Sequence, residues 1–245
     1  RSRGLGDVYK RQHVAICVKS KFNSSYKDIP DEQLDEVIKY IEFLKENPKV
    51  LLPNPFYKIY EGATIMAGAE PYYVNSEESN GFKPDFASIP ESVWKDCQLL
   101  ILCSPSNPTG QVYSKAELIN LAEIIKKHKN LYILSDDIYE YIRYQNNERF
   151  YTIAELDAEI FSRTLTMNGV SKAYSMTGWR IGYCGGPIEI INAMRKLMGQ
   201  STSNPSSISQ WATVEALNGS KDFLNLWIES FKERRDFIVN YLFCI

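Results

Sequence analysis

Histidine and cysteine are scarce in this sequence, and neither is arranged for metal binding. There are two histidines, His13 and His128, and five cysteines, none of which forms a C-x-x-C pair. Zinc sites need several such ligands at short spacings, so we predict no metal site. Scattered cysteines in an odd number cannot form a complete disulfide framework. They are typical of a reducing compartment, which predicts a cytoplasmic protein.

A strong net charge and long apolar segments are also absent. The 245 residues carry a formal net charge of −2. No apolar run approaches the roughly 18 residues that a membrane-spanning helix requires. We therefore expect neither a nucleic acid nor a membrane as a partner. With 44% hydrophobic and 24% charged residues, the composition is that of an ordinary globular chain and excludes wholesale disorder.

The first 47 residues differ in character from the rest of the chain. Residues 2–12 read SRGLGDVYKRQ, and one back-translation of this string matches a common transposase-based sequencing-library adaptor. We therefore expect residues 1–12 to be a non-native tail, with a flexible basic extension as the alternative, and we expect no secretory signal. Residues 13–47 are an unassigned segment. Apolar residues recur there at helical spacing over 34–44, which predicts an amphipathic helix that packs on its own domain or, alternatively, binds a partner.

Strand and helix patterns alternate from residue 48 onward. Three segments are expected strands: 99–103, 131–134 and 164–167, of which 99–103 is a continuous apolar run without alternation. Such a run is typical of a strand that is buried on both faces of a parallel sheet. Ser114 and Glu117 form an S-x-x-E capping box at the start of a helix that we expect to end at Asn130. We predict further helices over 187–200, 206–218 and 222–242. The order of elements indicates an α/β doubly wound fold.

A polar cluster follows each of the three predicted strands. The clusters are SPSNPTG after the first strand, SDDIYE after the second and NGVSKAYSMTGWR after the third. In open parallel sheets, ligands bind at the carboxyl ends of the strands. We therefore expect the three clusters to converge on one crevice.

Lys172 is the leading catalytic candidate in the third cluster. It closely follows a buried strand and precedes Arg180 by eight residues. A lysine near a cation and in an apolar crevice has a lowered pKa and can form a Schiff base. Arg180 can hold a phosphate through a bidentate contact, with Ser171 and Ser175 as further phosphate partners. The alternative for Lys172 is an ordinary surface lysine.

The other two clusters supply an anion and hydrogen-bonding groups. A pyridine ring stays protonated only beside an anion, which Asp136 can provide. Tyr139 and Asn107 can each bond an oxygen on the same ring. A helix cap or solvated turn explains one of the adjacent aspartates, Asp136 and Asp137, but not both. For Asn107, a turn role in S-N-P-T-G stays open.

Three motifs, in their order and spacing, together resemble the class I/II aminotransferases. They are S-P-S-N-P-T-G, S-D-D-I-Y-E and G-V-S-K-A-Y-S-M-T-G-W-R-I-G. The class I/II aminotransferases are fold-type-I enzymes that use pyridoxal 5'-phosphate. The resemblance covers about residues 48–242 and implies a three-layer α/β/α large domain with a mostly parallel sheet. It also implies an enzyme that moves an amino group between an amino acid and a 2-oxo acid through a Schiff base on the cofactor.

The resemblance implies a role for each candidate residue. Lys172 would carry the cofactor and move the α-proton of the substrate, and Asp136 would pair with the pyridine nitrogen. Tyr139 and Asn107 would bond the ring hydroxyl oxygen. Arg180 would bind the cofactor phosphate.

One more candidate lies in the segment P-N-P-F-Y-K-I-Y. Tyr57 falls where the family has an aromatic residue that stacks on the cofactor ring. A core aromatic is the open alternative for this residue.

The resemblance is uneven along the chain. Residues 136–217 are similar to gamma-type bacterial aspartate aminotransferases, whereas residues 48–112 look more like succinyldiaminopimelate aminotransferases. An aspartate-like substrate is favoured. The alternatives are succinyldiaminopimelate, another pyridoxal-phosphate reaction such as a β-lyase, and a vestigial fold with a binding or regulatory role. The change in resemblance also raises the hypothesis that the chain is chimeric.

Two parts of the family pattern have no counterpart in the sequence. Residues 13–47 contain no small-residue phosphate loop, and the C-terminal small domain, with its substrate-carboxylate arginine, would lie beyond Ile245. We therefore expect residues 48–220 to form the cofactor-binding large domain and residues 221–245 to begin a truncated C-terminal region. The fragment would be weakly active or inactive. Family members are usually homodimers, so the resemblance implies a homodimer.

Overall fold

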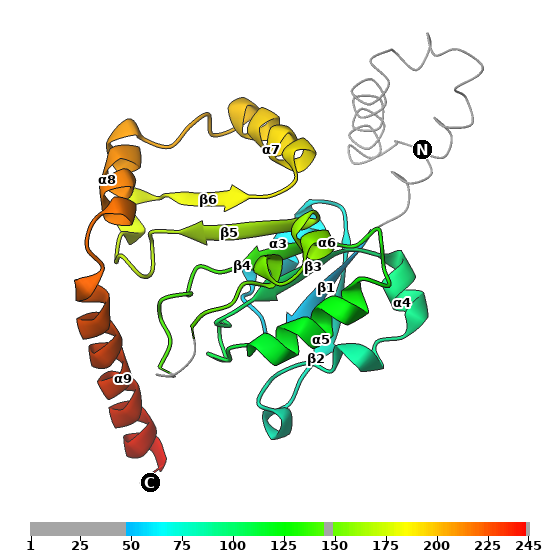
Figure 1. The fold of residues 1–245 in the computed structure, drawn as a ribbon, viewed down its shortest axis with the longest axis horizontal. Coiled ribbons are helices and arrows are strands. Elements are labelled where there is room, and N and C mark those ends of the chain that lie inside the picture. Colours follow the sequence, from blue (N-terminus) through cyan, green and yellow to red (C-terminus); the bar gives the residue numbers. More distant parts are fainter. Residues whose placement is uncertain (1–47, 145–148, 244–245) are drawn as a thin grey trace, which may run out of the picture. The chain divides into compact units, whose positions relative to one another are not determined.

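A six-stranded sheet lies at the centre of the structure, a computed structural model that describes residues 48–144 and 149–243 (Figure 1). The strands are β1 Lys49–Asn54, β2 Glu70–Asn75, β3 Cys97–Cys103, β4 Tyr132–Asp136, β5 Thr164–Gly169 and β6 Gly182–Gly185. Their order across the sheet is β2-β1-β3-β4-β5-β6. All neighbours are parallel except β6, which is antiparallel to β5. The predicted α/β fold with a mostly parallel sheet is confirmed.

Helices connect and flank these strands. The α-helices are α3 Ile59–Met66, α4 Glu91–Asp96, α5 Lys115–Ile125, α6 Ala158–Phe161, α7 Ile188–Gln200, α8 Ser207–Asn218 and α9 Asp222–Phe243. Short 3-10 helices are η2 Glu78–Asn80, η3 Phe86–Ser88, η4 Ile153–Glu155 and η5 Thr177–Trp179. The three predicted C-terminal helices therefore match α7, α8 and α9. The predicted tail and the helix within residues 13–47 lie outside the described residues.

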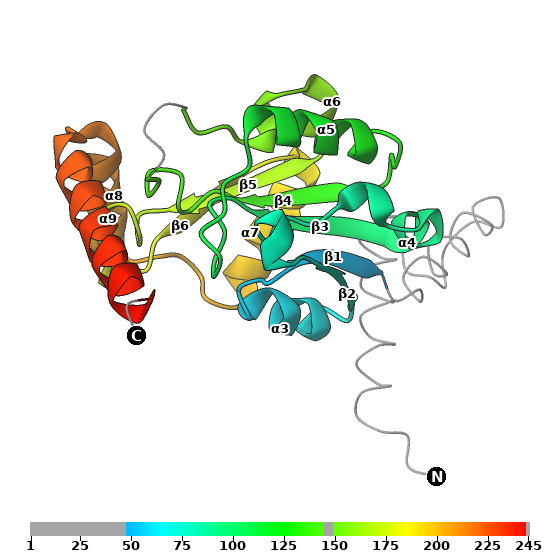
Figure 2. The same cartoon turned by 90° about the horizontal axis from the view of Figure 1, so that it is seen from below.

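Helices cover both faces of the sheet. Successive side chains of a strand point to opposite sides, so neighbouring residues of one strand pack against different helices. Leu51 of β1 belongs to a buried cluster that includes Leu118 of α5. Its neighbour Leu52 belongs to a second cluster that includes Tyr60 of α3. Figure 2 shows α5 and α3 on opposite sides of the sheet. This arrangement is the predicted three-layer α/β/α architecture.

A separate apolar cluster supports the loop that follows β5. Val170, Ala173 and Tyr174 of that loop are buried and pack in one cluster with Leu224 of α9. The start of α9 therefore anchors the segment on either side of Lys172. All of these elements belong to one compact unit, Lys49–Ile245. The proposed division at residue 220 stays a prediction.

The capping box predicted for α5 is present. The Ser114 hydroxyl accepts a hydrogen bond from the Glu117 amide, and the Glu117 carboxylate accepts one from the Ser114 amide at 2.7 Å. The helix ends at Ile125, earlier than the expected Asn130. Arg163 donates to the backbone carbonyls of Ile125 and His128, so it satisfies groups that a continuing helix would use.

Two observations concern the described residues alone. No helix among them is both long and apolar enough to span a bilayer. Within residues 48–144 and 149–243, no group of three or more histidine, cysteine or acidic side chains is placed to hold a metal ion.

Candidate active site

The three polar clusters lie at the same edge of the sheet. Cys103 at the end of β3 pairs with Asp136 at the end of β4, and Asp136 pairs with Met167 near the end of β5. Asn107 follows β3 by four residues, and Lys172 follows β5 by three. Parallel register therefore brings the carboxyl ends of three neighbouring strands, and the loops that carry the candidates, to one place.

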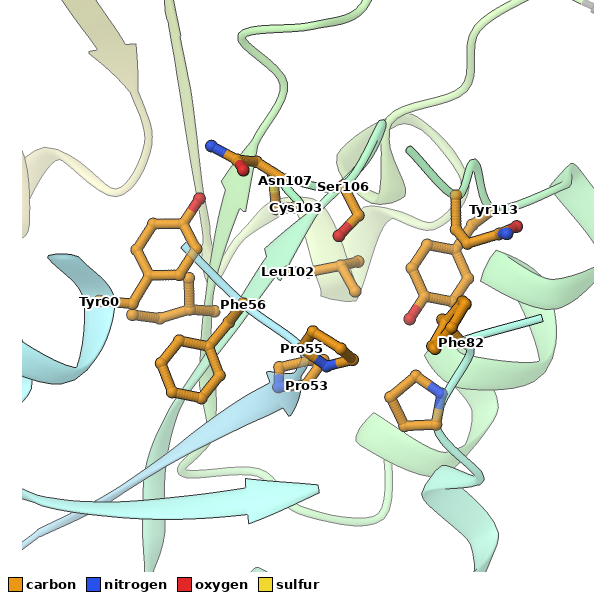
Figure 3. A pocket seen from close by; sticks show the side chains of 13 residues that line it. Pro53, Pro55, Phe56, Tyr60, Phe82, Leu102, Cys103, Ser106, Asn107 and Tyr113 are labelled. Carbon is orange, nitrogen blue, oxygen red and sulfur yellow. The ribbon is translucent and has the colours of Figure 1, made fainter. Parts of the chain in front are cut away.

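Contacts between the loops support this convergence. The Lys172 ammonium nitrogen lies 5.7 Å from the centre of the Tyr139 ring, so the loops after β4 and β5 meet. Asn107 and Tyr139 line one cavity of about 350 Å³, so the loops after β3 and β4 meet as well. Asn107 also lines a second pocket together with Tyr60 and Cys103 (Figure 3). The structure thus brings Asn107, Tyr139 and Lys172 together.

Asp136 is buried and held through both carboxylate oxygens. The Tyr60 hydroxyl donates to Oδ2 at 2.6 Å, and the Ile138 amide donates to Oδ1 at 3.3 Å. Burial raises the pKa of the Asp136 carboxyl above its ordinary value, and the two hydrogen bonds oppose that rise because they favour the ionised form. The site therefore contains a buried carboxylate whose charge depends on its hydrogen bonds.

Asp137 is the more strongly perturbed of the two aspartates. Its side chain is 3% exposed, and the Ser135 hydroxyl donates to it at 2.7 Å. Burial raises the pKa of this carboxyl to about 6. The two aspartates therefore have different partners. Asp136 accepts a hydrogen bond from Tyr60 of α3, whereas Asp137 accepts one from Ser135 of its own strand.

Lys172 lies in the loop between β5 and η5, and its side chain is exposed. Lys172 is therefore not enclosed in an apolar crevice by the described residues, and its exposure matches the alternative of a surface lysine. Its catalytic role stays a prediction. The buried neighbours Ala173 and Tyr174 turn inward and anchor the loop, which leaves Lys172 on its outer side against the Tyr139 ring. The backbone of the next turn is constrained, because Ser175 has a positive φ of 52°.

Arg180 is attached to the same loop through two hydrogen bonds. Its guanidinium donates to the Thr177 carbonyl at 2.9 Å, and the Thr177 hydroxyl donates to the Ser171 carbonyl at 3.1 Å. Arg180 itself is exposed and has a left-handed φ of 56°. The arginine and the lysine thus belong to one connected turn.

Tyr57 lies just before α3 and is 46% exposed, so the alternative of a core aromatic is wrong. Its ring meets the Tyr60 ring edge-on, with centres 5.7 Å apart and planes at 88°. An exposed ring held at one edge can still stack on a planar ligand. Its role towards a cofactor stays a prediction.

Sequence reasoning missed two residues that shape this site. Tyr60 bonds Asp136 from 76 residues away. Glu140 accepts a hydrogen bond from the Asn168 side chain at 2.7 Å, which joins the Tyr139 loop to the end of β5. A partial signal existed for each, because Tyr60 follows Tyr57 by three residues on a short helix and Glu140 ends the SDDIYE motif.

The chemistry of this donor set fits pyridoxal 5'-phosphate. A buried carboxylate, Asp136, suits a protonated ring nitrogen, and the Lys172 amine suits an aldehyde carbon. The Asn107 amide and the Tyr139 phenol suit a ring oxygen, and the Arg180 guanidinium suits a phosphate. The fold and site together define an α/β protein with a lysine-centred site at the carboxyl edge of its sheet.

Comparison with known proteins gives the family. The family "Aminotransferase class I and II" matches residues 34–243. The aspartate/prephenate aminotransferase of Cereibacter sphaeroides is 42% identical over 199 residues, which are 81% of this chain and 50% of that protein. A probable aspartate/prephenate aminotransferase of Rickettsia prowazekii is 39% identical over 92% of this chain and 59% of its own length. The chain therefore belongs to the class I and II aminotransferases.

A solved structure agrees with this assignment. The crystal structure of the aspartate aminotransferase from Rhizobium meliloti superposes with a TM-score of 0.77 at 43% identity and covers 82% of this chain and 50% of that one. The chain spans about half the length of the relatives it matches.

Proposed function

We propose that this chain binds pyridoxal 5'-phosphate and forms the cofactor-binding part of an aminotransferase. The enzyme would move an amino group between an amino acid, with aspartate favoured, and a 2-oxo acid. The observation that carries this proposal is the contact of Lys172 with Tyr139 beside Asp136 and Asn107 at one sheet edge. Family membership and relatives named for aspartate support the substrate class.

The residues of the chain would divide the work. When bound, the cofactor supplies an electron sink for the negative charge left on the α-carbon of the amino acid. Asp136 would keep the ring nitrogen protonated, which makes that sink effective. Tyr139 and Asn107 would orient the ring through its hydroxyl oxygen, and Arg180 would hold the phosphate. Nζ of Lys172 would take up the α-proton of the substrate.

Covalent capture of the cofactor tests this proposal. The chain is incubated with pyridoxal 5'-phosphate, reduced with borohydride and digested, and the modified lysine is identified by mass spectrometry. We expect modification at Lys172 and its loss in Lys172→Ala. Lys115→Ala is the matched control, because the Lys115 amine also lies over a tyrosine ring, that of Tyr151, at 5.5 Å. Modification spread evenly over surface lysines would contradict the proposal.

Turnover is a separate measurement from cofactor capture. A panel of aspartate and succinyldiaminopimelate, each with an oxo-acid acceptor, and a β-lyase substrate without one reports the choice of substrate and reaction. We expect weak or no turnover by the 245 residues alone, and any activity present to be greatest with aspartate. Fast aspartate transamination that Lys172→Ala abolishes would refute the expected weakness and support the reaction.

We also propose that the protein is a cytoplasmic homodimer. Large apolar side chains are exposed on α7 and α8, among them Leu197, Ile208 and Trp211, and a second copy would cover them. The described cysteines, Cys97, Cys103 and Cys184, are free thiols, as in a reducing compartment. Light scattering after gel filtration measures the mass, and a strictly monomeric chain would contradict the dimer.

A further inference from the structure

Tyr60 connects helix α3 to the end of β4 through one buried hydrogen bond. Its hydroxyl donates to Oδ2 of Asp136 at 2.6 Å, and the two side chains are 7% and 5% exposed. A hydrogen bond to an ionised acceptor in a buried place is stronger than one between neutral groups. Tyr60 is therefore suited to control the Asp136 carboxylate.

Few other groups act on that carboxylate. In the part of the chain that the structure describes, Asp136 is affected by burial, by Tyr60 and by the backbone amide of Ile138. Cys103 of β3 and the adjacent Asp137 lie close enough that the Asp136 charge raises their pKa values. A negative charge on Asp136 therefore disfavours ionisation of Cys103 and Asp137, and neither of these neighbours stabilises that charge. Tyr60 is thus the side chain that favours the ionised form.

Helix α3 is itself fixed in place. Glu61, next to Tyr60, accepts hydrogen bonds from Lys58 and from the hydroxyl of Tyr73 on β2. The ring of Tyr60 also meets Tyr57 edge-on. Tyr60 therefore touches the predicted ring-stacking residue with its ring and the predicted nitrogen partner with its hydroxyl.

We infer that Tyr60 is a positioning residue of the cofactor site, whose hydroxyl keeps the Asp136 carboxylate ionised and oriented for a protonated ring nitrogen. This inference rests on the proposed function for the identity of the cofactor. The effect of Tyr60 on Asp136 does not depend on it, because both side chains and their contact belong to the chain.

The first experiment needs no cofactor. The carboxyl of Asp136 is followed by NMR with isotope-labelled aspartate across a pH titration, with Asp136→Asn used to assign the signal. In Tyr60→Phe, we expect the pKa of Asp136 to rise by about one unit or more, because a hydrogen bond to a charged group is worth about tenfold or more in an equilibrium. Tyr73→Phe is the matched control. It also removes a phenol that donates to a carboxylate, that of Glu61 on α3, and it leaves the contacts of Asp136 unchanged.

The second experiment measures the dissociation constant of pyridoxal 5'-phosphate as a function of pH. We expect Tyr60→Phe to weaken binding about tenfold or more, and the ratio to the unmodified chain to grow as the pH falls, because the variant protonates Asp136 first. Combined with Asp136→Asn, the Tyr60→Phe change should cost almost nothing more. Tyr73→Phe should leave the pH profile unchanged.

The outcomes separate the two proposals. An unchanged Asp136 titration in Tyr60→Phe overturns the inference, as does a binding loss that persists in full beside Asp136→Asn. If the unmodified chain fails to capture the cofactor on Lys172, the proposed function fails, and the cofactor-free titration still decides whether Tyr60 controls Asp136. A lost fold in Tyr60→Phe, seen by circular dichroism while Tyr73→Phe stays folded, would show a structural role instead and would also overturn the inference.

Discussion

Substitution of Asp137 by asparagine should stabilise the chain, and the gain should depend on pH. The Asp137 carboxyl is 3% exposed, and its pKa rises from 3.8 to about 6 because burial disfavours the charge. Its hydrogen bond from Ser135 offsets only part of that cost. Asparagine has the shape of the protonated carboxyl and carries no charge, so it removes the cost of ionising a buried acid.

The magnitude follows from linkage between protonation and folding. Between pH 3.8 and about 6, the folded chain holds a proton on Asp137 that the unfolded chain has lost, so stability falls as the pH rises through this window. A rise of that size corresponds to about 3 kcal/mol in the free energy of unfolding at pH 7. In Asp137→Asn, the free energy of unfolding should not show this fall with rising pH. The difference between variant and unmodified chain should be near zero at pH 4 and reach up to about 3 kcal/mol at pH 7.

Urea unfolding at several pH values between 4 and 7 measures the difference. Asp222→Asn is the matched control, because Ser220 donates to Asp222 with the same two-residue spacing on an exposed surface. The exposed carboxylate keeps its water, so we expect no gain that grows with pH. A constant difference for Asp137→Asn across the range, or a loss of stability at pH 7, would refute the reasoning.

Three further variants test the packing around the site, each by urea unfolding. Arg163→Lys should lower the free energy of unfolding by about 2–4 kcal/mol. The buried guanidinium donates to three backbone carbonyls, more than lysine can reach from one nitrogen. A loss below about 0.5 kcal/mol, as for a surface substitution, would contradict this prediction. Ser114→Ala should cost about 1 kcal/mol through loss of the capping box with Glu117, and Ser114→Thr should restore most of it. Gly169→Ala should cost about 1–3 kcal/mol, because its Cβ would lie 2.9 Å from the Ile181 carbonyl, whereas Gly178→Ala, with nothing within 4 Å, should be tolerated.

The parts of the fold that sequence predicted are those with local causes. The run Leu99–Leu102 is apolar on both faces, and it forms a strand that is covered on both faces. Ser114 and Glu117 stand three residues apart and cap α5 as expected. By contrast, β6 has four residues, two of them glycine, and no apolar alternation. β6 forms because it pairs with the edge of β5, and the local sequence of β6 carries no signal of that pairing.

The candidate site divides in the same way. Asp136 was found because it ends an apolar strand, and Lys172 because a distinctive motif surrounds it. The sequence left the exposure of Lys172 open, since it depends on which loop neighbours turn inward, and Ala173 and Tyr174 do so against α9. Burial of a single loop residue is decided by packing between segments that lie far apart in the chain.

Tyr60 shows why one part of the site was not predicted from the sequence. A carboxylate at a strand end can satisfy its oxygens from water, from its own turn or from another element, and sequence does not distinguish these. The structure gives Asp136 one bond from its own turn, at Ile138, and one from α3, 76 residues away. The second bond is the shorter and the more buried. Burial raises the pKa of Asp136, and the hydrogen bond that most opposes this rise comes from a residue outside the motif. The chemistry assigned to a short motif is therefore a property of the motif together with whatever the fold packs against it.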